Sequence, residues 1–119
     1  MTAQALGLAL AVVWLVESDG DYHPADGDGG KAVGPLQIWM CVVEDVNQRY
    51  GTEYTSADRR DLSRSVEIFC RYQMMYPSTS LEGRCRLWNG GPSRRGTDGY
   101  WAKCKRALER IEKWSTNIP

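Results

Sequence analysis

A glutamate at the end of an apolar segment, followed by a series of aspartates, is the part of this sequence best suited to acid catalysis. Glu17 directly follows the apolar residues 3–16. Four aspartates come next, among glycines: Asp19, Asp21, Asp26 and Asp28. If the apolar stretch is a buried helix, desolvation and the negative end of the helix dipole both favour the protonated carboxyl group of Glu17. Such a group could act as a general acid near neutral pH, although position alone favours a solvated Glu17 past the helix end.

Three short sequence blocks accompany this glutamate. They are "ES" at residues 17–18, "GPLQI" at residues 34–38 and "LWNGGP" at residues 87–92. In order and spacing they resemble the signature blocks of the lysozyme-like superfamily, which includes goose-type lysozymes, invertebrate-type lysozymes and soluble lytic transglycosylases. The later run "WNGGPSRRGTDGYWAK" is also similar to that of invertebrate-type lysozymes. The resemblance covers about residues 10–105, nearly the whole chain.

The resemblance implies a role for each matching residue. Glu17 matches the general acid of the family. Five further residues match substrate-binding positions: Ser18, Gln37, Trp88, Asn89 and Tyr100. Gln37 would line the cleft beside the acid, and Asn89 would contact the sugar. Trp88 stands where many relatives have tyrosine, so it offers ring stacking without the hydroxyl contacts. Tyr100 would close the far wall, or serve only as an aromatic that packs between helices.

Asp28 is the preferred second carboxylate. Aligned on "GPLQI", it coincides with an aspartate of goose-type lysozymes, and it follows Glu17 by 11 residues. A loop of that length can fold back across a sugar, since each residue spans up to about 3.5 Å. Asp26 is its nearest rival, whereas Asp19 and Asp21 are expected to order the loop or to remain solvated.

The function that these blocks predict is hydrolysis of the β-1,4 bond between N-acetylmuramic acid and N-acetylglucosamine in peptidoglycan. Three alternatives remain open. A lytic transglycosylase would use Glu17 alone and leave 1,6-anhydro ends. A chitin- or chitosan-cleaving enzyme would share the fold and the acid. A non-catalytic wall-binding protein would keep only the scaffold.

The elements that must position these residues are mainly helices. We expect a single lysozyme-like domain spanning residues 1–119, with about five helices around a buried N-terminal helix and a small β-like region near residues 20–37. The expected helices cover residues 3–16, 40–50, 62–76, 81–88 and 98–114. Asp61, Ser80 and Thr97 are the expected N-caps, and Gly51 is the expected stop of the second helix.

Two of these helices carry apolar stripes that predict which face is buried. The stripe of the helix at residues 62–76 contains Leu62, Val66, Phe69, Cys70 and Met74. The stripe of the last helix contains Trp101, Cys104, Leu108 and Ile111. Both follow the helical period, so we expect these side chains to face the core.

Cysteine spacing argues against a metal centre. The four cysteines lack a C-x-x-C pair, and the single His23 cannot complete a metal shell, so we expect no metal and no cofactor. Two disulfides would suit an extracellular protein and four thiols a cytosolic one. If a disulfide forms, Cys70 with Cys85 is the preferred pair, because they lie on adjacent predicted helices.

Charge and hydropathy limit the kinds of partner that we expect this protein to have. Fifteen basic and fifteen acidic residues give a formal net charge of zero, which argues against general attraction to nucleic acid or to anionic membranes. No segment reaches the roughly 18 apolar residues of a spanning helix. The stretch "ALGLALAVVWLV" lacks a basic n-region and a cleavage site, so we expect mature structure and no signal peptide. Peptidoglycan glycan strands are the expected partner of a monomer; the cellular location stays open.

Overall fold

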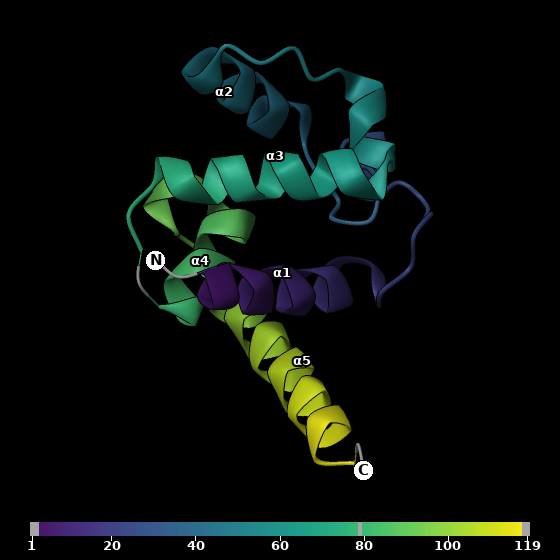
Figure 1. Ribbon diagram of the computed structural model, residues 1–119, viewed down its shortest axis with the longest axis vertical. Coiled ribbons are helices and arrows are strands. Elements are labelled where there is room, and N and C mark those ends of the chain that lie inside the picture. Colours follow the sequence, from purple (N-terminus) through teal and green to yellow (C-terminus); the bar gives the residue numbers. More distant parts are fainter. Residues whose placement is uncertain (1–2, 79, 118–119) are drawn as a thin grey trace. The chain divides into compact units, whose positions relative to one another are not determined.

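A computed structural model describes residues 3–78 and 80–117, which are mainly helical (Figure 1). Within them the α-helices are α1 (Ala3–Ser18), α2 (Met40–Tyr50), α3 (Leu62–Met75), α4 (Leu81–Gly90) and α5 (Asp98–Thr116). Short 3-10 helices are η1 (Asp28–Gly30), η2 (Ser56–Arg60) and η3 (Gly91–Ser93). The chain forms two compact units. The central unit is residues 17–77, and the terminal unit contains the described residues on either side of it.

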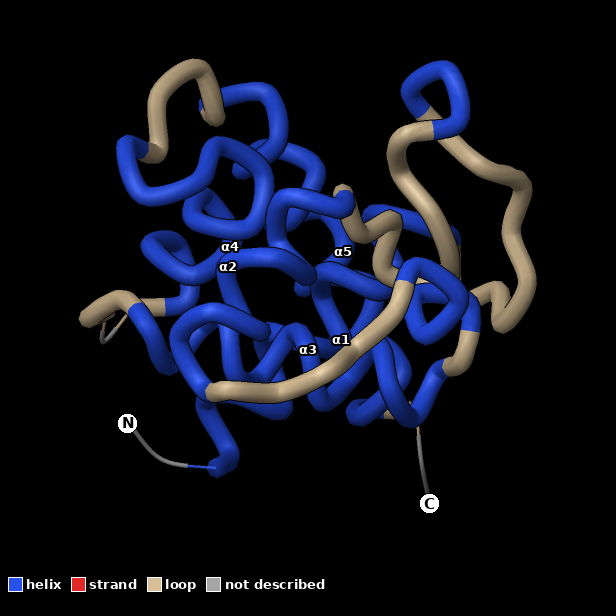
Figure 2. Tube along the Cα trace, turned by 90° about the horizontal axis from the view of Figure 1, so that it is seen from above, coloured by secondary structure: helices blue, strands red, loops and turns tan. Residues whose placement is uncertain are grey.

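The mainly α-helical class with five α-helices is confirmed for the described residues. Figure 2 accordingly contains helices and loops without a strand. In this described part, the only β pairing consists of two isolated antiparallel bridges, Gly27 with Ala32 and Val33 with Ile38. The small β-like region expected near residues 20–37 is therefore present, and it extends to Ile38. The lysozyme-like arrangement and the single domain over residues 1–119 stay predictions.

The N-terminal helix is longer and more exposed than predicted. α1 continues past Val16 to Ser18. Three of its residues at helical spacing are fully buried: Ala9, Val12 and Val13. Leu8 is 38% exposed, so the prediction of a helix buried on every side is wrong. The apolar residues outnumber those that one buried face can hold, and the remainder lie partly in solvent. None of the described helices has the length and apolarity needed to cross a membrane.

The central unit is built on α2 and α3, which pack against each other (Figure 1). Gly51 ends α2 in the left-handed conformation, with φ of 66°, which glycine adopts without a Cβ clash. The carboxylate of Asp61 accepts a hydrogen bond from the backbone amide of Ser63 at the start of α3. Both predicted helix ends are therefore confirmed. Buried apolar side chains of the two helices include Val43, Val46, Ile68 and Phe69.

The buried face of α3 differs from the predicted stripe. Only Phe69 of that stripe is fully buried; Leu62, Val66 and Cys70 are half-buried, and Met74 is 64% exposed. The observed face also follows the helical period but includes polar residues: Ser65, Ile68, Phe69, Tyr72 and Gln73. One reason is that Ser65 Oγ donates a 2.7 Å hydrogen bond to the carbonyl of Arg59. A satisfied polar group can be buried, so hydrophobicity alone misplaced this face.

The terminal unit includes α4 and α5, which pack against each other. Ser80 caps α4 as predicted, because its hydroxyl accepts from the backbone amide of Gly83 at 3.0 Å. α4 continues two residues past the predicted end at Trp88, to Gly90. A Cβ on Gly90 would lie 2.6 Å from Thr97 Cγ2, so the absence of a side chain permits this close approach.

The start and the buried face of α5 were predicted only in part. Thr97 makes no side-chain cap bond; its hydroxyl instead donates to the carbonyl of Arg94 at 2.7 Å. Thr97 therefore occupies the predicted N-cap position, but its side chain does not cap the helix. The expected stripe is confirmed at Cys104, which is fully buried, whereas Trp101, Leu108 and Ile111 are half-buried. α5 ends at Thr116, two residues past the predicted end.

All four cysteines are free thiols, so the structure lacks the disulfide between Cys70 and Cys85. Cys85 lies on α4 and Cys104 on α5, and both are fully buried. A hydrogen bond between their thiols, together with burial, raises the pKa of Cys85 above its ordinary value. The contact partner of Cys85 is therefore Cys104, a pairing that the order of the cysteines along the chain does not reveal.

Thiol reactivity should follow this burial. At pH 8 we expect Ellman's reagent to react rapidly with exposed Cys41 and with Cys85 and Cys104 only after unfolding, because burial keeps the reagent away from these two thiols. The variant Cys41→Ser should lose the rapid phase. Unfolding in urea without reductant should release all the remaining thiols. A missing pair of thiols there would show that a disulfide forms after all.

Candidate active site

Glu17 occupies the end of α1, where the chain enters the central unit. It is half-buried and is the penultimate residue of the helix, so it does not lie in solvent past the helix end. The neighbouring Ser18 donates its hydroxyl hydrogen to the carbonyl of Pro35 at 2.8 Å and approaches the carbonyl of Asp21 at 3.2 Å. The blocks "ES" and "GPLQI" are therefore joined directly, although 17 residues separate Ser18 from Pro35.

The loop after α1 contains several left-handed residues, as its glycines and aspartates predict. Asp19, Asp28 and Gln37 have φ values of 53°, 50° and 51°. Four glycines in the same region also have positive φ: Gly20, Gly29, Gly30 and Gly34. Aspartate tolerates this conformation better than most residues, whereas glutamine does so less readily. Gln37 therefore needs support from the surrounding loop.

That support comes from the side-chain amide of Gln37. Its Nε2 donates to the carbonyl of Gly34 at 2.9 Å and to the carbonyl of Ala25 at 3.3 Å. Its Oε1 would lie 2.4 Å from a Cβ placed on Gly27, so this glycine leaves the space that the amide fills. Gln37 is thus a positioning residue that holds the loop against itself. Its contact with substrate stays a prediction.

A buried arginine holds the same loop to η2. Arg59 is 8% exposed, and its Nη1 donates to the carbonyls of Ile38 at 3.0 Å and Lys31 at 3.3 Å. Its Nε and Nη2 bind the carbonyl and hydroxyl of Ser56 at 3.1 and 2.6 Å. A buried guanidinium is tolerated when its hydrogens have acceptors, and carbonyl oxygens supply them here. The loop residues around "GPLQI" are therefore fixed by one side chain.

Asp26 and Asp28 have different environments. Asp26 forms a bidentate ion pair with Arg60, at 2.9 and 3.0 Å, and the hydrogen bond from Arg60 lowers the pKa of Asp26. Asp28 begins η1, and its residue is exposed. Asp26 therefore has an ion-pair partner in the central unit, and the role of Asp28 as the second carboxylate stays a prediction.

Two residues of this region were missed by sequence reasoning. Arg59 has no local signature, because its acceptors on Ile38 and Lys31 lie 21 and 28 residues away. Trp39 could have been singled out from the sequence, since it directly follows the "GPLQI" block. Its residue is 41% exposed, and the ammonium group of Lys31 lies 5.6 Å from the centroid of its ring. Trp39 is therefore an exposed aromatic directly after the "GPLQI" block.

The other predicted site residues belong to the terminal unit. Trp88 is half-buried and Asn89 is exposed, both in the last turn of α4. Tyr100 is half-buried in the first turn of α5. That these side chains line one cleft with Glu17 stays a prediction. Within the central unit, Ser18 lies beside the loop that carries Gln37 and Asp28.

The described residues contain no group of three histidine, cysteine, aspartate or glutamate side chains that could hold a metal ion. Comparison of the chain with protein-family models, curated proteins and solved structures finds no match. The function must therefore be argued from the arrangement of the residues themselves.

Gly34 should be the most sensitive backbone position of the loop. It has φ of 81°, and a Cβ there would lie 1.7 Å from the carbonyl oxygen of Arg59. We expect Gly34→Ala to lower the free energy of unfolding by about 3 kcal/mol or more, because strain and a backbone clash add. Gly29→Ala is the matched control, since Gly29 has φ of 68° with nothing within 4 Å. Strain alone should cost that variant about 1–2 kcal/mol. Urea unfolding measures both, and equal losses would contradict the role of the close approach.

Proposed function

We propose that this protein is a muramidase that hydrolyses the β-1,4 bond between N-acetylmuramic acid and N-acetylglucosamine in peptidoglycan. Glu17 is the general acid and Asp28 is the second carboxylate. The single observation that carries the proposal is the 2.8 Å hydrogen bond from Ser18 Oγ to the carbonyl of Pro35. It joins two of the three sequence blocks beside Glu17, which supports reading them as parts of one site.

The proposed chemistry needs one proton donor and one anion or activated water. A glycosidic oxygen leaves readily only when it is protonated, and the sugar ring passes through an oxocarbenium-like state. Glu17 is half-buried at the carbonyl end of α1, and in this proposal its carboxyl group supplies the proton. Asp28 is exposed on a loop held by Gln37 and Arg59, so its carboxylate can orient water or stabilise positive charge.

Binding of the glycan is proposed for the residues that match substrate-binding positions of the family. In this proposal, Trp88 stacks on a sugar ring, and Asn89 and Tyr100 hydrogen-bond it. Mass analysis of the products from purified peptidoglycan tests the reaction itself. Hydrolysis gives reducing ends, whereas 1,6-anhydro ends would identify a lytic transglycosylase instead. An absence of cleavage would contradict the enzymatic proposal.

Replacement of the proposed acid should abolish turnover without unfolding the protein. Glu17→Gln keeps the shape of the side chain but cannot give up a proton, so we expect a loss of about 10²–10⁴ in rate. Asp19→Asn is the matched control, because it removes one negative charge two residues away and asparagine tolerates the φ of 53° at that position. Circular dichroism checks the fold of both. If Glu17→Gln retains more than about a tenth of the wild-type rate, Glu17 is not the acid.

A pair of aspartate variants separates the two candidate second carboxylates. Asp28→Asn should lower the hydrolysis rate by about tenfold or more, because the amide carries no charge to stabilise the cation. Its fold should persist, since asparagine also tolerates the φ of 50° there. Asp26→Asn loses its ion pair with Arg60 and should retain hydrolysis. Loss in Asp26→Asn with full activity in Asp28→Asn would transfer the role to Asp26.

A further inference from the structure

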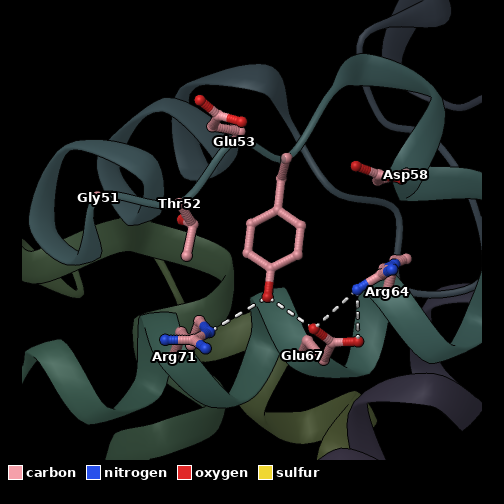
Figure 3. A pocket seen from close by; sticks show the side chains of 8 residues that line it. Gly51, Thr52, Glu53, Asp58, Arg64, Glu67 and Arg71 are labelled. Atoms are coloured by element: carbon pink, nitrogen blue, oxygen red, sulfur yellow. Dashed lines mark hydrogen bonds and ion pairs between the residues drawn. The ribbon is translucent and has the colours of Figure 1, made fainter.

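A second candidate binding site is a pocket of about 490 Å³ in the central unit (Figure 3). The segment from Gly51 to Tyr54 forms one wall. Three charged residues of α3 form the other: Arg64, Glu67 and Arg71. None of them belongs to the proposed glycosidase site. The volume lies within the range of small-ligand pockets, and the lining is largely polar and charged.

The wall opposite α3 is held in place by Asn47 at the end of α2. Its Oδ1 accepts from the hydroxyl of Thr52 at 2.8 Å and from the backbone amide of Tyr54 at 3.0 Å. Its Nδ2 donates to the carbonyl of Tyr54 at 2.9 Å. One side chain thus makes three hydrogen bonds to the segment, so this wall is fixed before any ligand arrives.

Tyr54 connects this wall to α3. Its hydroxyl donates to Glu67 Oε1 at 2.8 Å and accepts from Arg71 Nε at 3.1 Å (Figure 3). Desolvation and the hydrogen bond to Glu67 raise the pKa of Tyr54, so the phenol keeps the proton that it donates. Arg64 Nη1 also binds both oxygens of Glu67, at 3.3 Å each. The carboxylate of Glu67 is therefore satisfied without Arg71.

Within the part of the chain that the structure describes, Arg71 makes no direct contact with a carboxylate. Its Nε binds a neutral hydroxyl, and its guanidinium carbon lies 5.3 Å from the centroid of the Tyr50 ring. These two contacts orient the guanidinium. Among the described residues Arg71 has no ion pair, and its two terminal amino groups make no hydrogen bond. Two parallel N–H donors in one plane match the two oxygens of a carboxylate.

We propose that this pocket binds the carboxylate end of a short peptide, with the terminal amino groups of Arg71 as the bidentate donors. A lone carboxylate would fill little of the volume, so the ligand must carry more atoms than the anion. The rest of the peptide would lie along the wall from Gly51 to Tyr54. Glu53 and Asp58 lie on the opposite side of the pocket from Arg71 in Figure 3, and their charges disfavour a multiply charged anion such as phosphate.

The test is a titration of the isotopically labelled protein by nuclear magnetic resonance. The probes are N-acetyl-alanyl-alanine and its C-terminal amide, which differ only in the carboxylate. We expect the acid to bind at least about tenfold more tightly than the amide, and Arg71→Gln to lose about tenfold or more in affinity for the acid. Acetate, the small-carboxylate probe, should bind more weakly than the peptide acid. Equal affinity of acid and amide, or of acetate and peptide acid, would overturn the proposal.

Arg49→Gln is the matched control. Arg49 also lies over the Tyr50 ring, with its guanidinium carbon 5.4 Å from the centroid, but it does not line this pocket. The Arg49→Gln variant changes the net charge by the same amount as Arg71→Gln and should leave the affinity for the peptide acid within about twofold.

If circular dichroism reveals that Arg71→Gln is unfolded, Arg71→Lys replaces it. The same loss of affinity is expected, because lysine lacks the two parallel N–H donors of a guanidinium group. Wild-type affinity in a folded Arg71 variant would reject the site. Glycan cleavage plays no part in this readout, so the two proposals stand or fall separately.

Discussion

The order of the candidate active-site loop depends on the buried guanidinium of Arg59. A charged side chain removed from water destabilises a fold unless its hydrogens find acceptors. Arg59 finds them on Lys31, Ile38 and Ser56, which lie in separate segments of the central unit. The carbonyl of the same residue accepts from Ser65 on α3. One residue thus ties the loop, η2 and α3 together, and loss of its side chain would remove the hydrogen bonds that join the loop to η2.

The loop separates structural from chemical roles among residues of the same type. Asp26 forms an ion pair with Arg60, and the side-chain amide of Gln37 donates hydrogen bonds to carbonyls of the loop. These interactions leave Asp28 exposed on a loop with fixed left-handed residues. A general acid and a second carboxylate must keep their spacing during a reaction, and hydrogen bonds of this kind limit the motion of the loop. The proposed muramidase chemistry therefore relies on side chains whose hydrogen bonds hold the loop in place.

Polar contacts also shape the other end of the central unit. Asn47 fixes the wall of the second pocket. The hydroxyl of Tyr54 accepts a hydrogen bond from Arg71 and donates one to Glu67. In both regions an arginine binds groups that carry no net charge. Arg59 is buried and its hydrogens have acceptors, whereas the terminal amino groups of Arg71 make no such bond within the described residues. That difference separates a structural arginine from one proposed to bind ligand.

The sequence by itself determined the elements that depend on local chemistry. Asp61, Ser80 and Gly51 marked helix ends, because caps and left-handed stops act on neighbouring backbone groups. The glycine-rich loop was also predictable from its composition, whereas the position of Glu17 in the sequence did not decide whether it lies inside the helix or in solvent past its end.

Only the tertiary structure decided which groups meet across long separations. The buried face of α3 turned toward Ser65 because the carbonyl of Arg59 accepts its hydroxyl. The thiol of Cys85 forms a hydrogen bond with Cys104. Arg60 forms an ion pair with Asp26, 34 residues away along the chain. No periodicity encodes such contacts. A buried polar group is placed by the partner that satisfies it, and that partner is fixed only when the chain has folded.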